Sequence, residues 1–292
     1  MRQRTFSGNT DSAPSAGTVS AARSELPRPP RSEDRRPSRA GSRSLLPVAG
    51  QRVLVTGGSS GIGMALARAL AGEGVSVVIT GREPDRLASV AESDPLIEGI
   101  VCDVTDDDQV RALGEHMLAA GGLDMLINCA GVMHFFDVRA GFPLQRQLQE
   151  VAIDVEGPMR MVDAFLPDLL TRPSTIVNVS SGLAWVPYAA APVYSGAKAF
   201  VHAWTISLRH QLKDTSVRVV EILPPVVDTP LAEGLNAGFS RMSPDDLVAA
   251  VMAGLRRGQK EISPGSAVGL KYLSRLAPRL IFGILNREAS RP

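Results

Sequence analysis

The sequence is poor in the features that hold secreted or membrane-embedded folds together. Two cysteines cannot form a disulfide framework, so we expect a reducing, cytoplasmic environment. No apolar run reaches the roughly 18 residues needed to cross a bilayer. With 8 Phe, 3 Tyr and 2 Trp among 292 residues, a core must consist mainly of Val, Leu, Ile and Ala. These absences exclude a cystine-rich secreted domain and a transmembrane channel.

A concentrated charge of one sign is also missing from the main part of the chain. Residues 1–44 contain nine Arg and four acidic residues, whereas the remainder contains 22 basic and 26 acidic residues. A weakly acidic body lacks the basic surface that phosphate backbones require, so we expect no nucleic-acid partner. Clusters of His, Cys and Asp with metal-ligand spacing are missing too, and we expect no metal.

Residues 1–46 differ in composition from the rest of the chain. Ser, Pro, Arg, Gly and Ala prevail, and a single Phe and a single Leu precede position 45. Such a segment buries too little apolar surface to offset the entropy of ordering, so we predict a disordered extension. Its composition loosely resembles an organelle transit peptide. A solvated tail, or a start codon placed too far upstream, explains it as well.

From position 47, short apolar runs alternate with helical patterns. The runs cover 51–56, 75–80, 97–102, 123–128, 175–179 and 217–223, and the longest helical patterns cover 144–170 and 192–213. Thr105 and the three Asp after it predict a helix that is capped by Thr105 and extends to about position 120. Strands that are apolar throughout indicate a parallel sheet covered on both faces. We therefore predict one α/β domain over 47–264, a Rossmann-type doubly wound parallel sheet, followed by an amphipathic helical extension over 265–292.

A glycine-rich stretch, Thr56-Gly-Gly-Ser-Ser-Gly-Ile-Gly63, lies between the first strand and the first helix. Glycines allow a tight turn and let the backbone approach a pyrophosphate, whose charge is stabilised at the helix N-terminus. A simple glycine-rich turn is the alternative, but the strand–turn–helix context favours a dinucleotide site.

Tyr194 and Lys198 lie four residues apart in a predicted helix and therefore share one face. The pKa of a free phenol is about 10. A neighbouring ammonium lowers this pKa because it favours the phenolate. Ser181, at the end of a predicted strand, supplies a hydroxyl that could hold a carbonyl oxygen. Taken singly, these residues are also explained by a solvated helix face and a strand-end turn.

Together these residues resemble the classical short-chain dehydrogenase/reductase family, over about positions 52–262. The pattern over 179–194 is similar to that of the bacterial DltE-type short-chain oxidoreductases. The resemblance implies an NAD(P)-dependent enzyme that interconverts a ketone or aldehyde and an alcohol. The matching motifs are Thr56–Gly63, Asp103, Asn128-Cys-Ala-Gly131, Asn178-Val-Ser-Ser181, Tyr194 with Lys198, and Pro224-Pro-Val-Val-Asp-Thr229.

The resemblance implies catalytic roles for single residues. Tyr194 would be the acid in reduction and the base in oxidation, and Ser181 would orient the substrate oxygen. Lys198 would bind the nicotinamide ribose and lower the pKa of Tyr194. The chain departs from the family at two positions. Asp154 stands where the family has an asparagine that assists a proton-relay water, and Pro225 stands where glycine is usual. We include Asp154 among the catalytic positions because its role there depends largely on the backbone carbonyl.

The resemblance also assigns a cofactor site. Asp103 would contact the adenine and Asn128 the adenosine ribose side. An acid at the end of the second strand would repel the 2′-phosphate of NADP(H), but Gly81 stands at that place. Arg82 follows it and could accommodate the phosphate. We therefore predict a preference for NADP(H), with NAD(H) as the alternative. If Arg82 instead points to solvent and pairs with Glu83 or Asp85, the preference has no basis. The other assigned positions are Gly57, Ser59, Ser60, Gly61, Ile62, Gly63, Val104, Ala130, Gly131, Pro224, Val227 and Thr229.

Loops after the predicted strands are expected to select the substrate. The segments 132–136, 183–188 and 231–239 are apolar, which favours an apolar carbonyl compound or alcohol, although packing or dimer contacts would explain them equally. His134 is a candidate second acid or base, and packing is its ordinary alternative. Lys271, Arg275 and Arg279 follow one helical stripe, which Pro278 interrupts. A membrane-surface helix has this pattern. We favour a helix that covers the active site or contacts another subunit.

Two rival functions remain open at this point. A dinucleotide sensor would need the fold but not Ser181, Tyr194 and Lys198. An epimerase or dehydratase acting on a nucleotide sugar usually has a larger C-terminal region than the one that follows Thr229. The family resemblance further implies a small-molecule substrate and a homodimer or homotetramer.

Overall fold

The computed structural model describes residues 44–46, 50–235 and 239–287, all of which belong to one compact unit, 41–292. Most of the extension predicted over 1–46 lies outside the described residues. Among these residues, no helix has both the length and the apolar character that crossing a bilayer requires.

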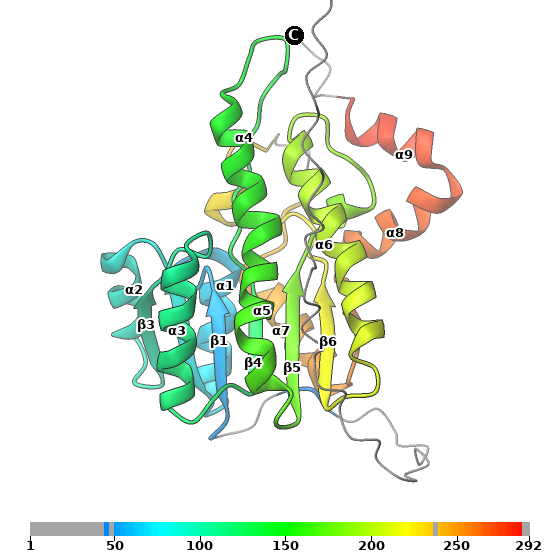
Figure 1. Cartoon of the computed structure of the whole chain (residues 1–292). Helices are drawn as coiled ribbons and strands as arrows, with labels where there is room; N and C mark the ends of the chain where they lie inside the picture. The colour runs from blue at the N-terminus through cyan, green and yellow to red at the C-terminus, as the bar shows by residue number, and fades with distance from the viewer. Residues whose placement is uncertain (1–43, 47–49, 236–238, 288–292) are drawn as a thin grey trace, which may run out of the picture. The chain divides into compact units, whose positions relative to one another are not determined.

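Seven parallel strands form one sheet in the order β3-β2-β1-β4-β5-β6-β7 (Figure 1). The doubly wound parallel sheet predicted from the sequence is confirmed, and the short β7 is an addition to it. Because the strand order reverses between β1 and β4, a crevice opens at the carboxyl ends of these two strands. The strands cover Arg52–Thr56 (β1), Ser76–Gly81 (β2), Ile97–Val101 (β3), Met125–Asn128 (β4), Ser174–Val179 (β5), Val217–Ile222 (β6) and Glu261–Ile262 (β7).

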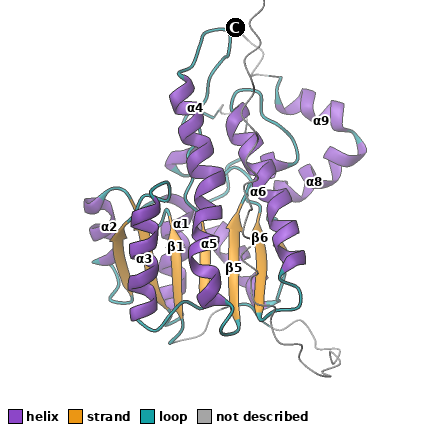
Figure 2. Ribbon diagram, in the orientation of Figure 1, coloured by secondary structure: helices purple, strands orange, loops and turns teal. Residues whose placement is uncertain are grey.

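Helices cover both faces of the sheet (Figure 2). On β1, Val53 and Val55 pack into one hydrophobic cluster, whereas Leu54 between them packs into the other. Strands buried on both faces need apolar residues at every position, which explains their continuous apolar runs. One cluster contains α1 (Gly61–Gly72), α2 (Pro84–Ala91) and α7 (Pro244–Arg256), and the other contains α3 (Asp107–Ala119), α5 (Gly157–Leu169) and α6 (Pro192–Gln211).

The long helix predicted over 144–170 is not uniform. It consists of α4 (Leu144–Val151), one π-helical turn, η1 (Ala152–Glu156), and α5. A π-helical turn inside an α-helix changes the direction of the side chains that follow and often occurs at functional sites. Asp154 lies in this turn and is fully buried. The sequence pattern did not predict the turn, because the apolar spacing of the two flanking helices is nearly continuous.

The cap predicted for the helix after β3 is wrong by one residue. Asp106 caps α3, and its carboxylate accepts hydrogen bonds from the backbone N–H groups of Asp108 and Gln109. The Thr105 hydroxyl instead donates to Oδ1 of Asp103 over 2.8 Å. Asp and Thr are both common helix caps. The Thr105 side chain does not cap α3 because its hydroxyl is hydrogen-bonded to Asp103.

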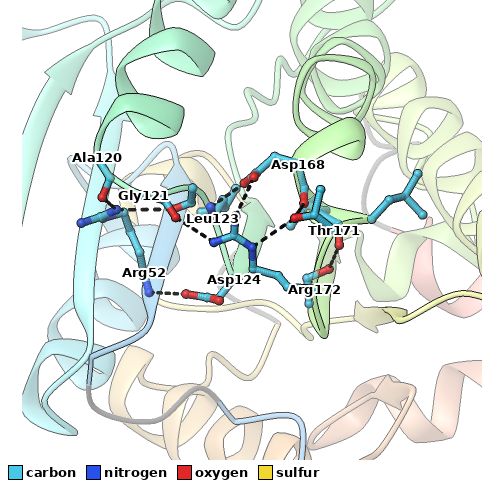
Figure 3. A network of polar contacts seen from close by, with 12 residues as sticks. Arg52, Ala120, Gly121, Leu123, Asp124, Asp168, Thr171 and Arg172 are labelled. Atoms are coloured by element: carbon cyan, nitrogen blue, oxygen red, sulfur yellow. Dashed lines mark hydrogen bonds and ion pairs between the residues drawn. The ribbon is translucent and has the colours of Figure 1, made fainter.

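A polar network joins β1, β4 and α5 at the amino-terminal ends of the strands, opposite the crevice (Figure 3). The carboxylate of Asp168, on α5, accepts from the backbone N–H of Leu123 over 2.6 Å and from Arg172 over 2.8 Å. Arg172 also donates to the carbonyl of Gly121 over 2.7 Å. This network fastens the α5 end to the turn before β4.

Two C-terminal helices, α8 (Ser266–Leu276) and α9 (Pro278–Leu285), lie beyond the carboxyl ends of the strands (Figure 1). Pro278 begins α9, since a proline tolerates the first turn of a helix but not its interior. Asn286 fastens the end of α9 to the loop before α6, where its amide donates to the carbonyl of Pro187 over 3.0 Å. Two 3₁₀ turns, η2 (Gly182–Ala184) and η3 (Pro230–Ala232), complete the described elements.

Candidate active site

A single cavity of about 800 Å³ occupies the crevice at the carboxyl ends of the strands. Nearly every site residue predicted from the sequence lies on the wall of this cavity. The exceptions are Asn128 and Asp154. Those on the wall are Gly57, Ser59, Ser60, Gly61, Ile62, Gly63, Arg82, Asp103, Val104, Ala130, Gly131, Ser181, Tyr194, Lys198, Pro224, Val227 and Thr229.

The glycine-rich turn between β1 and α1 has no room for a side chain at Gly57 or Gly63. Gly57 has a φ of +68°, and a Cβ atom there would lie 2.7 Å from Cα of Ala130. At Gly63, a Cβ atom would lie 2.3 Å from the carbonyl oxygen of Gly57. Ser60 precedes α1 and makes no side-chain bond to the first turn. The first N–H groups of the helix therefore stay available to an anion at the cavity wall, which fits a pyrophosphate.

Arg82 follows β2 and is exposed at the mouth of the cavity. Glu83 pairs with Arg86 over 2.9 Å, and no ion pair involves Arg82 among the described residues. Of the two acids that could have neutralised Arg82, Glu83 is therefore engaged elsewhere, and Asp85 is not paired with Arg82. A Cβ atom at Gly81 would lie 3.0 Å from Oγ of Ser59, which is a tight contact with that side chain.

Asn128 does not reach the cavity. Its amide Nδ2 donates to Oδ1 of Asn178 over 2.9 Å, and Asn178 in turn donates to Thr205 over 2.9 Å. This buried chain joins β4, β5 and α6 behind the site. Thr56 shapes the following loop, because its hydroxyl accepts from the backbone N–H groups of Cys129 and Ala130 over 3.0 and 3.1 Å.

Ser181, Tyr194 and Lys198 converge on the cavity from two elements. Ser181 follows the end of β5, and its hydroxyl accepts from the backbone N–H of Leu183 over 3.1 Å. Tyr194 and Lys198 lie one turn apart on α6, and Nζ of Lys198 lies 5.3 Å from the centre of the Tyr194 ring. All three side chains are largely buried.

Burial and charge oppose each other at Tyr194. Burial raises the pKa of Tyr194, the Lys198 ammonium lowers it, and the Asp154 carboxylate raises it. The lysine acts in the direction that the sequence predicts, but burial outweighs it, so the Tyr194 pKa lies above its ordinary value. The phenol is therefore protonated at neutral pH and can donate a proton.

Asp154 supports Lys198 from behind the cavity wall. Its Oδ2 lies 3.3 Å from Nζ of Lys198, and its Oδ1 accepts from the backbone N–H of Val132 over 2.8 Å. Burial would lower the pKa of Lys198, but Asp154 and then Tyr194 raise it, and the net direction is upward. The lysine therefore carries its positive charge beside Tyr194.

A second buried carboxylate, which the sequence did not single out, lies one helical turn before Asp154. Glu150 is fully buried, and its Oε2 lies 3.1 Å from Nδ1 of His134. Burial raises the pKa of Glu150, and His134 lowers it. His134 is not on the cavity wall, so no contact places it beside a substrate. The sequence feature that could have identified Glu150 is its spacing of four residues from Asp154 in a predicted helix.

The far part of the cavity is apolar. Met133, Leu183 and Phe239 come from the three loops that the sequence identified. The α8 and α9 helices add a further wall to the cavity. Covering the active site was one of three roles that the sequence pattern suggested for this segment. The lining residues from these helices include Leu270, Leu273, Ile281, Ile284 and Leu285.

The chain matches the model of the family described as short chain dehydrogenase over residues 51–239. It is 37% identical over 245 residues to "Uncharacterized oxidoreductase DltE" of Bacillus subtilis (strain 168), covering 81% of this chain and 96% of that protein. It is 34% identical over 212 residues to "Uncharacterized oxidoreductase SSP0419" of Staphylococcus saprophyticus, covering 70% of this chain and 90% of that protein.

Solved structures show the same fold. A short-chain dehydrogenase from Burkholderia cenocepacia J2315, solved in complex with NADP, has a TM-score of 0.73 at 26% identity and covers 84% of this chain and 99% of its own. A short-chain dehydrogenase/reductase from Burkholderia phymatum, solved with NAD, has a TM-score of 0.72 at 21% identity and covers 84% of this chain and 98% of its own. The chain belongs to the short-chain dehydrogenase/reductase family, in its DltE-like subgroup, and is an NAD(P)-dependent oxidoreductase.

Proposed function

We propose that this enzyme reduces an apolar ketone or aldehyde to an alcohol with NADPH, using Ser181, Tyr194 and Lys198. The observation that carries the proposal is the convergence of these three side chains on one cavity with the glycine-rich turn. A protonated Tyr194 beside a charged Lys198 supports the reducing direction, because reduction consumes a proton.

The cavity suits a nicotinamide dinucleotide. The amino-terminal end of α1 would hold the pyrophosphate, Asp103 the adenine side, and Val227 and Thr229 the nicotinamide side. When bound, the dinucleotide supplies the hydride that the carbonyl carbon accepts in reduction. The residues of the chain would orient the two partners and exclude water.

The side chains would handle the proton. The Ser181 hydroxyl donates a hydrogen bond to the carbonyl oxygen and so orients it. Tyr194 donates its phenolic proton to the same oxygen, which becomes the alcohol. The phenolate that remains is stabilised by the Lys198 ammonium, and it regains a proton before the next turnover.

A preference for NADPH is supported by Arg82. This guanidinium has no ion-pair partner among the described residues and faces the cavity mouth. Arginine binds phosphate through paired, charge-assisted hydrogen bonds, so the 2′-phosphate of NADPH is the natural partner. Arg86 lies on the same wall but is paired with Glu83.

The substrate class is inferred from the apolar wall. Side chains of Leu, Ile, Met and Phe line the far part of the cavity, and Tyr194 and Ser181 lie on the same cavity wall. We further propose a cytoplasmic homo-oligomer. The two cysteines are free, which supports a reducing compartment. Leu144, Leu148 and Phe200 expose apolar surface on α4 and α6, which supports a subunit contact there.

The test is a panel of aliphatic ketones and aldehydes of increasing chain length, assayed by NADPH oxidation. We expect kcat/KM to rise with chain length. Tyr194→Phe should lose about 10²–10⁴-fold in kcat, while its Kd for NADPH stays the same. Unchanged turnover in this variant contradicts the proposed role. NADPH binding without turnover of any carbonyl indicates the sensor instead.

A further inference from the structure

The outer sides of α8 and α9 expose an unusual number of apolar side chains. Leu276 and Leu280 are 81% and 63% exposed, although they flank the Ala277–Pro278 break between the helices. Monomeric proteins rarely expose contiguous apolar patches without a partner for them. We name the set the α8–α9 surface: Val268, Tyr272, Leu273, Leu276, Leu280, Phe282 and Ile284.

The same segment is positively charged. Between positions 262 and 287 the sequence has four basic residues and no acidic residue. Lys271 pairs with Glu261, whereas no ion pair involves Arg275 or Arg279 among the described residues. Both arginines are exposed next to Leu276 and Leu280. Exposed apolar side chains and two arginines without an ion pair among the described residues therefore lie on the same two helices.

The α8–α9 surface is continuous with the cavity. Leu273 and Ile284 line the cavity and are also 44% and 53% exposed to solvent. One side chain comes from each helix, so residues of the α8–α9 surface also form part of the apolar wall of the cavity.

We propose that the α8–α9 surface binds to an anionic lipid bilayer and that the apolar carbonyl substrate enters the cavity from this bilayer. Apolar side chains would insert among the acyl chains, and Arg275 and Arg279 would meet the lipid phosphates. The second half of this proposal rests on the proposed function, and the first half does not. The helices have 11 and 8 residues, about 17 and 12 Å at 1.5 Å per residue, and would lie on a bilayer.

A second copy of the chain is a poorer occupant. In a twofold dimer through the α8–α9 surface, the same patch of both copies forms the interface, which would then contain Arg275 and Arg279 of both copies. The segment has no acidic residue to pair with them. Like charges brought together at an interface cost free energy, whereas an anionic bilayer gains from the same arginines.

The test is flotation of the full chain with vesicles of phosphatidylcholine alone or mixed with phosphatidylglycerol, at low and high salt. We expect binding to the mixed vesicles only, weakened by salt. Leu276→Ser with Leu280→Ser, and separately Arg275→Glu with Arg279→Glu, should each weaken binding about tenfold or more. None of these four residues lines the cavity.

Matched controls carry the same changes elsewhere on the exposed surface. Leu118→Ser with Val138→Ser changes two exposed apolar residues, and Arg111→Glu with Arg146→Glu reverses two exposed charges. Both controls should bind vesicles like the unaltered chain. Equal losses in the controls overturn the assignment to α8 and α9, and so does an unaltered chain that stays with the soluble fraction.

Two further measurements separate this proposal from the proposed function. Leu276→Ser with Leu280→Ser should leave turnover of a short, water-soluble ketone unchanged and raise KM about tenfold for a long-chain ketone supplied in mixed vesicles. Vesicle binding without turnover of any carbonyl keeps the docking surface and removes the proposed function. A dimer that this double variant converts to monomers makes the surface a subunit contact and overturns the proposal.

Discussion

The Nζ atom of Lys198 lies 3.3 Å from Oδ2 of Asp154, a carboxylate with no solvent exposure. The two residues come from α6 and from the π-helical turn between α4 and α5. An amide at position 154, as in the family pattern, would leave the Lys198 ammonium without an anion. The carboxylate holds the lysine charged, and its own negative charge raises the pKa of Tyr194.

Asp154→Asn is expected to move the pH profile of reduction. The carboxylate raises the pKa of Tyr194 and also that of Lys198, so its removal lowers both. Reduction needs a protonated Tyr194 and fails as pH rises through its pKa. The alkaline limb of kcat/KM should therefore lie at lower pH in Asp154→Asn, with activity retained at neutral pH.

Glu150→Gln is the matched control for this experiment. Glu150 is also buried, but it is not among the groups that shift the pKa of Tyr194 or of Lys198. The alkaline limb should stay nearly in place in this variant. An equal shift in both variants, or none in Asp154→Asn, means that Asp154 does not set the acidity of the site.

Gly81→Asp combined with Arg82→Ala should reverse the cofactor preference. The new carboxylate can accept hydrogen bonds from the ribose hydroxyls of NADH, and loss of the guanidinium removes the partner of a 2′-phosphate. Charge-assisted hydrogen bonds of this kind account for about 10–100-fold in affinity. The ratio of kcat/KM for NADPH and NADH should change by at least that factor, and Arg111→Ala should leave it unchanged. A constant ratio removes Arg82 from cofactor selection.

Gly57→Ala is expected to abolish dinucleotide binding or folding. A methyl group at a φ of +68° is strained, and it would lie 2.7 Å from Cα of Ala130. Gly72→Ala is the control, because a Cβ atom at Gly72 meets nothing within 4 Å. Thermal unfolding with and without NADPH measures both effects. A variant at Gly57 that gains as much thermal stability from NADPH as the unaltered chain contradicts the tight-turn argument.

Asp168→Ala should destabilise the fold while sparing the chemistry. The change leaves the N–H of Leu123 without its acceptor, which costs about 1–3 kcal/mol, and removes one of the acceptors of the Arg172 guanidinium. Asp163→Ala, at an exposed position on the same helix, should cost much less. Urea unfolding gives the difference, and kcat at low temperature should match the unaltered chain. Equal stability of the two variants would show that the network in Figure 3 contributes little.

Local patterns in the sequence were enough to predict the order of the first six strands and most of the helices between them, and the family resemblance implied many of the residues that lie on the cavity wall. Short apolar runs, a glycine-rich turn and the spacing of Tyr194 and Lys198 are features of neighbouring residues, and each has a direct structural cause. Parallel strands then bring their carboxyl ends to one edge of the sheet, so residues far apart in the chain meet there.

Tertiary structure decided what depends on packing between distant elements. Asn128 follows the predicted motif, yet it turns inward because Asn178 offers its amide a buried acceptor. The pairing of Lys198 with Asp154 requires the π-helical turn, which side-chain periodicity does not reveal. Whether α8 and α9 cover the cavity depended on where the chain after β7 folds back. Burial is a property of the whole assembly, and for that reason only the folded chain shows that it outweighs Lys198 in the pKa of Tyr194.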